Sequence, residues 1–310
     1  MYDTIHLWLP TEKGGSYSPN QASKSLSLLT EHQKHGGEVY FSGMLNGTYR
    51  VNFSEKGVSL KGSLAKFFLN DNFSTLTRSD CSRAFEKMAD DLSLPIDHAT
   101  VTRLDFAQNF IMQYQPEVYY PYLGHSRYYK RLSQPKSVYW ANGTKTKLIY
   151  DKVAEAKTKK NSIPDIWQGQ KVLRYELRYT KRLPKNLKQP EIKAYTLSKE
   201  KFYVALVDQW IAEYDSIQKL NEINLNYPKM KSPKVALDLL LAEKINEMGP
   251  QKSMDWVEGL RARAAFEKPE YYSRLKKEMM KRLKNLDLTT TSDLITELDK
   301  KVRSVKKYYR

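Results

Sequence analysis

The chain has 310 residues, of which 40% are hydrophobic, and a formal net charge of +17. This length can bury one sizeable core and a second, smaller one, and the composition is typical of a globular rather than a disordered chain. No apolar run approaches the roughly 18 residues that cross a bilayer, so we expect no membrane partner. The single cysteine, Cys81, excludes an internal disulfide and a cysteine zinc site.

The positive charge is concentrated in the middle of the chain. Residues 100–197 contain 19 Lys and Arg against 7 Asp and Glu, which accounts for +12 of the total +17. A polyanion gains affinity from every cation that displaces a phosphate counterion. The uneven distribution therefore favours nucleic-acid binding over a generally basic surface.

The first hundred residues predict an antiparallel meander. Residues 4–9 alternate in hydrophobicity, and residues 38–62 continue the pattern with turns at Asn46–Gly47 and Lys56–Gly57. His32 and His35 lie three residues apart on an expected helix, a spacing that indicates a solvated face rather than a metal site. The first fifteen residues lack the basic and apolar segments of an export signal, so no export is expected.

Two helices are expected to follow the meander and to pack on one face of the sheet. Ser63 is positioned to cap a helix that starts at residue 64. Asp80 or Ser82 is expected to begin a second helix, which stops before Pro95 because proline cannot continue it.

Three charged, strand-like segments follow, at residues 102–110, 146–155 and 172–182. Successive side chains of a strand point to opposite faces, so every second residue shares a face. We therefore expect carboxylates, cations and a tyrosine to meet on one face of the sheet. The residues that alternate in this way are Arg103, Asp105, Ala107 and Asn109; Leu148, Tyr150 and Lys152; and Arg174, Glu176 and Arg178.

These segments predict an α+β fold with an antiparallel sheet of about five strands and helices on one face. Asn142–Gly143 supplies a hairpin turn before the tyrosine strand, and the segment around residues 172–182 is expected to complete the sheet. Beyond Pro184 the apolar spacing changes to three and four, which is typical of helices. We expect a domain at residues 1–190 and a helical domain at residues 191–310.

Tyr150 and Lys152 suit nucleophilic attack on a phosphodiester. Such a transesterification needs a nucleophile, a cation near the phosphate oxygens and a route for the nucleophile's proton. A phenol with a pKa near 10 needs a nearby cation to favour the phenolate, and Lys152 follows two residues along the expected strand. The alternative is that Tyr150 is one of 22 tyrosines and packs in the core.

Asp105 and Glu176 are candidate ligands of a divalent ion. They lie in otherwise apolar strands, where a carboxylate is costly unless it is paired or bound to metal. Their hard oxygens suit Mg²⁺ or Mn²⁺. Ion pairs with Arg103, Arg174 or Arg178 are an equally good explanation of the same pattern.

The basic and aromatic segment at residues 127–132, with Tyr139 and Trp140, is expected to contact DNA through phosphates and stacked bases. Whether the cationic residues 300–310 grip duplex DNA or form a solvated end stays open. No nucleotide-binding glycine loop, HExxH or G-x-S-x-G motif is present, and the five histidines form no His-x-His pair. The candidate DNA-binding residues are Arg103, Arg127, Lys130, Arg131, Lys145, Lys147, Arg174 and Arg178.

In these segments the chain resembles rolling-circle replication initiators of the filamentous-phage gene II/X type and, more loosely, the Rep_trans plasmid initiators. The resemblance extends from residue 1 to about residue 190. It rests on an Arg-x-Asp strand at 103–105, a tyrosine strand followed by Lys152 and Glu155, and an Arg-Tyr-Glu-x-Arg strand at 174–178. It implies a Rep-like form of the fold, similar to HUH endonucleases.

The resemblance further implies that Tyr150 nicks one DNA strand, forming a 5′-phosphotyrosyl link and a free 3′-hydroxyl. Asp105 and Glu176 would hold Mg²⁺ or Mn²⁺, and Lys152 would support the phenolate. The implied partners are single-stranded and double-stranded DNA at a replication origin and the host helicase and polymerase, in the cytoplasm of a bacterial host. Related plasmid sequences often carry an acidic residue where this chain has Asn109.

Two other functions fit the same residues. A relaxase or transposase would use the same chemistry for a different cellular purpose. A non-catalytic origin-binding protein would use the three strands as structural ion pairs.

Overall fold

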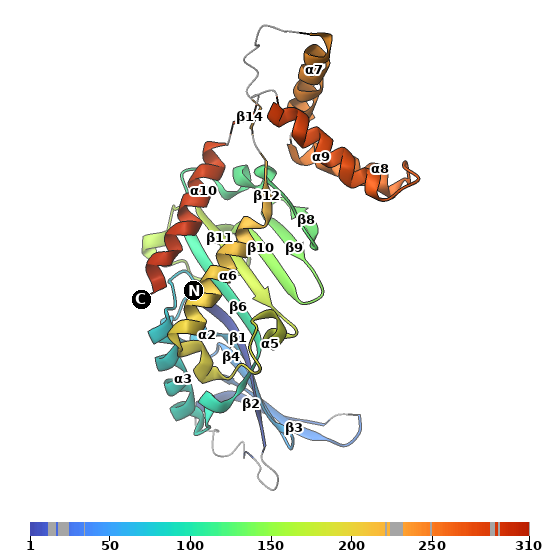
Figure 1. Ribbon diagram of the computed structural model, residues 1–310. Coiled ribbons are helices and arrows are strands. Elements are labelled where there is room, and N and C mark those ends of the chain that lie inside the picture. The colour runs from blue at the N-terminus through green and yellow to red at the C-terminus, as the bar shows by residue number, and fades with distance from the viewer. Residues whose placement is uncertain are drawn as a thin grey trace.

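A large antiparallel sheet forms the centre of the molecule (Figure 1). The computed structural model describes residues 1–11, 17, 25–33, 35–220, 222–223, 232–248, 250–285, 289–290 and 292–309. Within these residues the sheet has ten strands in the order β2-β3-β4-β5-β1-β6-β11-β10-β9-β8. The strands of this sheet are β1 (Tyr2–Pro10), β2 (Leu26–Gln33), β3 (Val39–Leu45), β4 (Tyr49–Ser54), β5 (Gly57–Ser63), β6 (Thr100–Ile111), β8 (Lys130–Gln134), β9 (Ser137–Ala141), β10 (Lys145–Asp151) and β11 (Val172–Tyr179).

Short strands and helices complete the described structure. Two small sheets pair β7 (Leu123–Ser126) with β12 (Ile217–Lys219) and β13 (Glu222–Ile223) with β14 (Thr289–Thr290). The α-helices are α2 (Leu64–Leu69), α3 (Arg78–Leu92), α4 (Lys152–Thr158), α5 (Leu183–Asn186), α6 (Glu200–Asp215), α7 (Pro233–Met248), α8 (Pro250–Ala262), α9 (Glu270–Asn285) and α10 (Asp293–Arg303). The 3₁₀ helices are Ile96–His98, Pro116–Tyr122, Asp165–Trp167, Ala194–Ser198 and Ser304–Tyr309.

The α+β class and the helical character of the last third are confirmed, but the predicted sheet size is wrong. The meander of the first third and the three charged strands form one sheet, because β1 pairs with both β5 and β6. The expected helix around His32 and His35 is also wrong. His32 lies in strand β2, where its ring stacks on Tyr40 of β3 at a centroid distance of 4.8 Å. The domain boundary at residue 190 stays a prediction.

Helix caps follow the local chemistry of hydroxyl and carboxylate side chains. Ser63 caps α2 as predicted, since its hydroxyl accepts a hydrogen bond from the backbone N–H of Lys66. The second helix begins earlier than expected, at Arg78. Thr77 is its N-cap, and Asp80 accepts a hydrogen bond from the backbone N–H of Thr77, which completes a capping box.

The predicted turns form, although their chemistry differs. Asn46 and Gly47 both have positive φ, 47° and 62°, as a tight hairpin between β3 and β4 requires. In the hairpin between β9 and β10 the side chain of Asn142 instead accepts hydrogen bonds from the backbone N–H groups of Thr144 and Lys145. At Gly57 (φ +146°) an added Cβ would lie 2.3 Å from the carbonyl oxygen of Leu9. Only glycine fits there.

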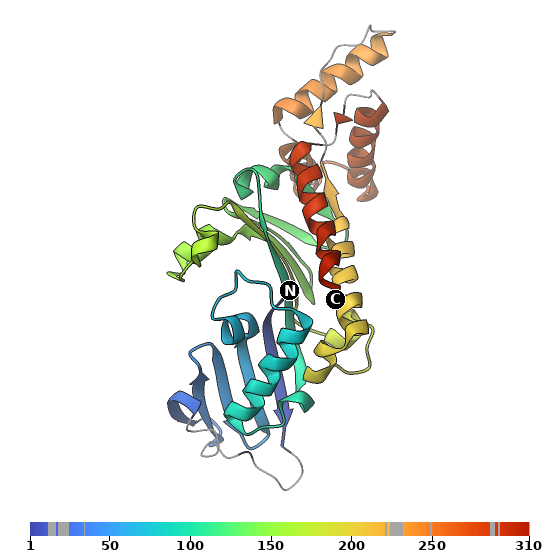
Figure 2. The same ribbon diagram turned by 90° about the vertical axis from the view of Figure 1, so that its left-hand side faces the viewer.

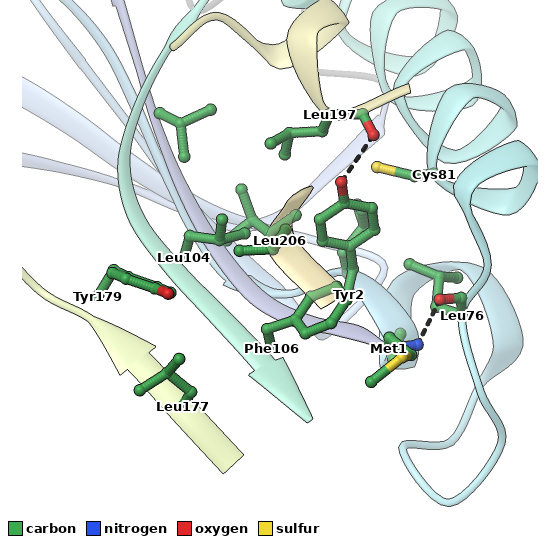
Figure 3. Packing of buried hydrophobic residues seen from close by; sticks show 14 of the residues in the cluster. Met1, Tyr2, Leu76, Cys81, Leu104, Phe106, Leu177, Tyr179, Leu197 and Leu206 are labelled. Atoms are coloured by element: carbon green, nitrogen blue, oxygen red, sulfur yellow. Dashed lines mark hydrogen bonds between the residues drawn. The ribbon is translucent and has the colours of Figure 1, made fainter. Parts of the chain in front are cut away.

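The main core lies between one face of the sheet and the helices that cover it. Helices α2, α3, α6 and α10 contribute buried residues to one apolar cluster with the sheet, and Figure 2 shows α6 and α10 running side by side along the sheet. In Figure 3, Tyr2 packs edge-on against Phe106 and donates a hydrogen bond to the carbonyl oxygen of Leu197. The short helix α4 is an exception, because its residues line a hollow on the other face.

Helices α7, α8 and α9 form a second, smaller apolar cluster away from the sheet (Figure 1). Met254, Val257 and Tyr272 are buried in it. A separate cluster of this size is expected to add stability mainly to its own three helices.

The capping residue of α3 gives a direct test of this description. Thr77→Ala removes a hydroxyl that accepts the N–H of Asp80, so we expect a loss of about 1 kcal/mol in the free energy of unfolding. Ser82→Ala is the matched control, because Ser82 lies inside the helix, where its hydroxyl donates a hydrogen bond to the exposed Glu86. It should change stability by less than about 0.5 kcal/mol in denaturant titrations. Equal losses in the two variants would contradict the assigned cap.

Candidate functional site

The three charged strands lie side by side in the middle of the sheet. Strand β11 is the central one, not a terminal strand, and it pairs with β6 on one side and β10 on the other. Arg178 lies opposite Asp105, and Arg174 lies opposite both Asn109 and Tyr150. The predicted alternation therefore brings the candidate carboxylates, arginines and tyrosine onto one face, which we call the open face.

A continuous chain of alternating charges crosses the open face. Arg103 binds Asp105 through two hydrogen bonds of 2.9 and 2.6 Å. Arg178 lies 3.9 Å from Asp105 and 2.6 Å from Glu176. Arg174 lies 3.4 Å from Glu176 and 2.5 Å from Asp3.

We call this row of charged side chains, from Arg103 to Asp3, the charge chain, and most of it is buried. Asp105, Arg174 and Glu176 are each 3% exposed or less. A buried charge costs several kcal/mol unless it is paired and hydrogen-bonded, and here each carboxylate contacts at least one guanidinium. The charged residues of the three strands thus form the ion pairs that the sequence pattern allowed as an alternative to metal binding.

Tyr150 lies at the edge of this charge chain. Its hydroxyl is 3.3 Å from Oε2 of Glu176, and its side chain is 8% exposed. The ring borders a hollow of about 250 Å³, whose lining includes Tyr139, Leu148, Arg178 and residues of α4. A phosphodiester that entered this hollow would meet the phenol and a guanidinium together.

Burial controls the protonation of Tyr150 and Glu176. Desolvation raises the pKa of Tyr150 well above 10, and Arg174 only partly offsets this effect. Burial also acts to raise the pKa of Glu176, but the attraction of Arg178 and Arg174 outweighs it and holds that pKa below its usual value. At neutral pH the phenol is therefore protonated, and the nearest proton acceptor is an ionised carboxylate.

The structure corrects the predicted position of Lys152. Strand β10 ends at Asp151, which caps α4, and Lys152 is the first residue of that helix rather than part of the strand. Its Nζ atom lies 2.8 Å from Oε2 of Glu155 and 5.1 Å from the ring centroid of Phe73. Burial, with a contribution from Arg174, lowers the pKa of Lys152 to about 8.

Asp105 and Glu176 provide the donor chemistry for a divalent ion, although arginines engage their oxygens. Burial and the nearby charge of Glu176 raise the pKa of Asp105, and the neighbouring Arg103 and Arg178 only partly offset this effect. Mg²⁺ is often bound through one or two carboxylates together with substrate phosphates, so a two-carboxylate set suffices. Among the described residues no group of three or more His, Cys, Asp or Glu side chains is arranged to hold a metal.

Asn109 does not act as a third ligand in this arrangement. Its amide group donates hydrogen bonds to the carbonyl oxygens of Asn72 and Phe73, and its oxygen accepts one from Arg174. Asn109 therefore holds the loop after α2 against the sheet.

The predicted DNA-binding cations do not form one surface. Arg103 and Arg178 are partly exposed on the open face, whereas Arg174 is buried. Lys145 and Lys147 both pair with Glu213 of α6, and Lys147 is fully buried beneath that helix.

The remaining three cations come from the segment between β7 and β9. The side chain of Arg131 donates hydrogen bonds to the carbonyl oxygens of Leu123 and Tyr120. Arg127 and Lys130 are exposed. These geometries leave Arg103, Arg127, Lys130 and Arg178 available to a ligand, whereas Lys147 is not accessible.

The sequence analysis did not identify Asp3 as part of the site, nor α4 as one side of the hollow beside Tyr150. Asp3 binds both Arg174 and the hydroxyl of Ser63, so it joins β1 to the charge chain. The signal was present, because Asp3 is a lone carboxylate in the apolar alternation of the first strand. Helix α4 was expected only as a basic helical stretch, and nothing in its composition places it over the open face.

Comparison with known families identifies one match. The family model described as the N-terminal region of the replication-associated protein of filamentous-phage gene II matches residues 1–213, more than half of the chain. The match includes the charge chain, Tyr150 and α6 up to residue 213. No curated protein matches the chain. Among the described residues, no helix is long and apolar enough to span a membrane.

The lowered pKa of Lys152 predicts a pH-dependent stability. A buried lysine with a pKa near 8, against about 10.5 in the unfolded chain, penalises folding below pH 8, and this penalty fades as the pH rises toward 10.5. Relative to Lys152→Met, the wild-type protein should gain roughly 2 kcal/mol between pH 8 and pH 10. Denaturant titrations at several pH values measure this difference. A constant difference across that range would contradict the buried, charge-crowded environment of Lys152.

Proposed function

The chain belongs to the family of the filamentous-phage gene II replication-associated protein, a family of phage replication initiators, and from this premise we propose that it nicks and rejoins one DNA strand at a replication origin. Tyr150 is the proposed nucleophile. The observation that carries the proposal is the position of its hydroxyl, 3.3 Å from Glu176 at the edge of a hollow that Arg178 also lines.

The proposed step is a transesterification in which atoms and charge balance. The Tyr150 oxygen attacks the scissile phosphorus, a bond from phosphorus to the 3′-oxygen breaks, and a 5′-phosphotyrosyl link forms. The phenol proton passes by way of the Glu176 carboxylate to the departing 3′-oxygen. Because Glu176 is a weak base, it relays this proton rather than keeping it. Arg178 offsets charge on the non-bridging phosphate oxygens.

The proposal includes a divalent ion, Mg²⁺ or Mn²⁺, held by Asp105 and Glu176. When bound, the ion would supply positive charge at the phosphate oxygens. Arg103 and Arg178 compete with it for the same carboxylate oxygens, so DNA phosphates that attract these arginines would free ligands for the ion. We infer that metal and DNA bind more tightly together than separately.

The proposed partners follow from this reaction. Origin DNA is recognised as a duplex and nicked as a single strand, and the free 3′-hydroxyl is extended by a host polymerase behind a host helicase. A second transesterification then closes the displaced strand, since the phosphotyrosyl link retains the energy of the broken bond.

A second candidate function is non-catalytic binding of origin DNA. It is favoured by one observation, the engagement of every arginine in the charge chain by a carboxylate. In that case Tyr150 would be a buried packing residue whose hydroxyl satisfies Glu176.

A covalent-adduct assay separates the two candidates. The protein is incubated with Mg²⁺ or Mn²⁺ and origin-containing single-stranded DNA, and denaturing gels report DNA that stays attached. We expect an adduct with the wild-type protein and none with Tyr150→Phe. The matched control is Tyr179→Phe, because Tyr179 lies on the neighbouring strand β11 and its buried hydroxyl has no hydrogen-bond partner in the described residues.

The outcomes distinguish the candidates directly. An adduct from Tyr179→Phe but not from Tyr150→Phe supports the nickase. If Tyr150→Phe forms as much adduct as the wild type, Tyr150 is not the nucleophile. A wild-type protein that binds origin DNA without forming an adduct at any metal concentration supports the non-catalytic candidate.

The ion requirement is tested on Asp105. Asp105→Asn removes one anionic ligand, so we expect about a 100-fold slower adduct formation and a higher half-maximal Mg²⁺ concentration. Asp97→Asn, an exposed carboxylate in the 3₁₀ helix before β6, serves as the control and should behave like the wild type. An unchanged Mg²⁺ dependence in Asp105→Asn would exclude Asp105 as a ligand.

A further inference from the structure

The open face continues beyond the charge chain, across the half of the sheet that contains β1, β5 and β4. Four basic side chains lie directly opposite one another on neighbouring strands. Arg50 pairs in register with Lys61, Lys61 with His6, and His6 with Arg103. We call Arg50, Lys61, His6 and Arg103 the cation row.

The cation row is electrostatically unfavourable in the free protein. Like charges directly opposite each other destabilise a sheet. Arg103 is paired with Asp105, but neither Arg50 nor Lys61 forms an ion pair within the described part of the chain, and both are exposed. Burial, Arg103 and Lys61 together lower the pKa of His6 to about 4, so His6 is neutral at pH 7 and separates the two cations. A polyanion would relieve this repulsion.

Aromatic and polar groups accompany the cation row. Trp8 is two residues beyond His6 on the same face, half-buried, and lies opposite Ser59 and Thr100. At the far end, a hollow of about 270 Å³ is lined by Arg50 and by the stacked rings of His32 and Tyr40. Cations that follow a backbone, interleaved with rings that accept bases, are typical of single-strand binding.

The geometry links this row to Tyr150. From β10 the sheet order runs through β11, β6, β1 and β5 to β4. Five strand spacings of about 4.8 Å give roughly 24 Å across the strands. The row is also displaced along the strands by about 20 Å, because Arg103 lies six residues before Asn109, which is in register with Arg174 and Tyr150. The exposed cations thus form a track that starts at the charge chain and runs across the strands.

We propose that single-stranded DNA lies across the open face along the cation row, with phosphates on Arg103, Lys61 and Arg50 and a base stacked on Trp8. The inference rests on the proposed function, because the strand leads to Tyr150. It adds a recognition surface on strands β1, β4 and β5, outside the basic segment at residues 100–197.

The test measures binding of a fluorescent 20-nucleotide oligo(dT) by anisotropy between 50 and 200 mM NaCl. All proteins carry Tyr150→Phe, which removes the proposed nucleophile. Arg50→Gln combined with Lys61→Gln removes two phosphate contacts, so the slope of log affinity against log salt should fall by about 1.4. Affinity at 50 mM salt should fall about tenfold or more. Trp8→Leu should weaken binding at least about fivefold with an unchanged slope, because stacking carries no counterion term.

The matched control is Lys87→Gln combined with Lys201→Gln. These exposed lysines lie on α3 and α6, at the helix-covered side of the sheet, and their removal changes the net charge equally. Affinity and salt slope should stay at the reference values. The Arg50 and Lys61 variant should melt at the same or a higher temperature than the reference, since it loses a repulsion, so weak binding cannot be assigned to unfolding.

Three outcomes would overturn the inference. The first is unchanged binding in the Arg50 and Lys61 variant, and the second is an equal loss of affinity in the Lys87 and Lys201 control. The third is a duplex of the same length that binds as tightly as the single strand and loses as much affinity in the Arg50 and Lys61 variant. The adduct assay on the wild-type protein is independent of these results. If the wild-type protein forms the adduct but the Arg50 and Lys61 variant binds DNA normally, only this inference is overturned. If single-stranded DNA binds along the cation row but no adduct forms, only the proposed nickase is overturned.

Discussion

The guanidinium of Arg174 is the contact on which the sheet and the candidate site both depend. It donates hydrogen bonds to Asp3 of β1, to Asn109 of β6, to Glu176 of its own strand and to the carbonyl oxygen of Asn72. The side chain is 4% exposed, so these contacts replace its hydration. Loss of the guanidinium would leave the buried carboxylate of Asp3 without its ion-pair partner and Glu176 with Arg178 alone. Breaking a buried ion pair in this way costs more than the intact pair contributes to stability.

This arrangement couples stability to the proposed chemistry. The contacts that fix Arg174 also fix Glu176, the partner of the Tyr150 hydroxyl. Arg103 and Arg178 are the more exposed members of the charge chain, and they hold the carboxylates that a divalent ion would use. The site carries little net charge because its three arginines pair with three carboxylates. In the proposed reaction, DNA phosphates and these carboxylates therefore compete for the same arginines.

The shared face of Asp105, Tyr150 and Glu176 was predictable because strand alternation needs only the sequence and the assumption of neighbouring strands. The size of the sheet was not. Strand β2 and strand β8 are mostly exposed and lack apolar alternation, so their pairing depends on partners distant in sequence.

Only the predicted strand position of Lys152 was wrong, because Asp151 caps a helix where the pattern suggested a continuing strand. Lys147 and Lys145 illustrate a second limit. Their charge suggested DNA binding, but α6, more than fifty residues later in the chain, brings Glu213 against them. Charge composition locates a basic region, whereas tertiary packing decides which cations reach a ligand.

The attachment site of DNA is the most direct measurement of the proposed mechanism. Trypsin cleaves after Lys147 and Lys152, which releases residues 148–152 with Tyr150 as their only hydroxyl-bearing side chain. Mass spectrometry of nuclease-trimmed adduct should find the nucleotide phosphate on this peptide, at Tyr150. A nucleotide on Tyr139 or on any other residue, with the 148–152 peptide unmodified, would contradict the mechanism.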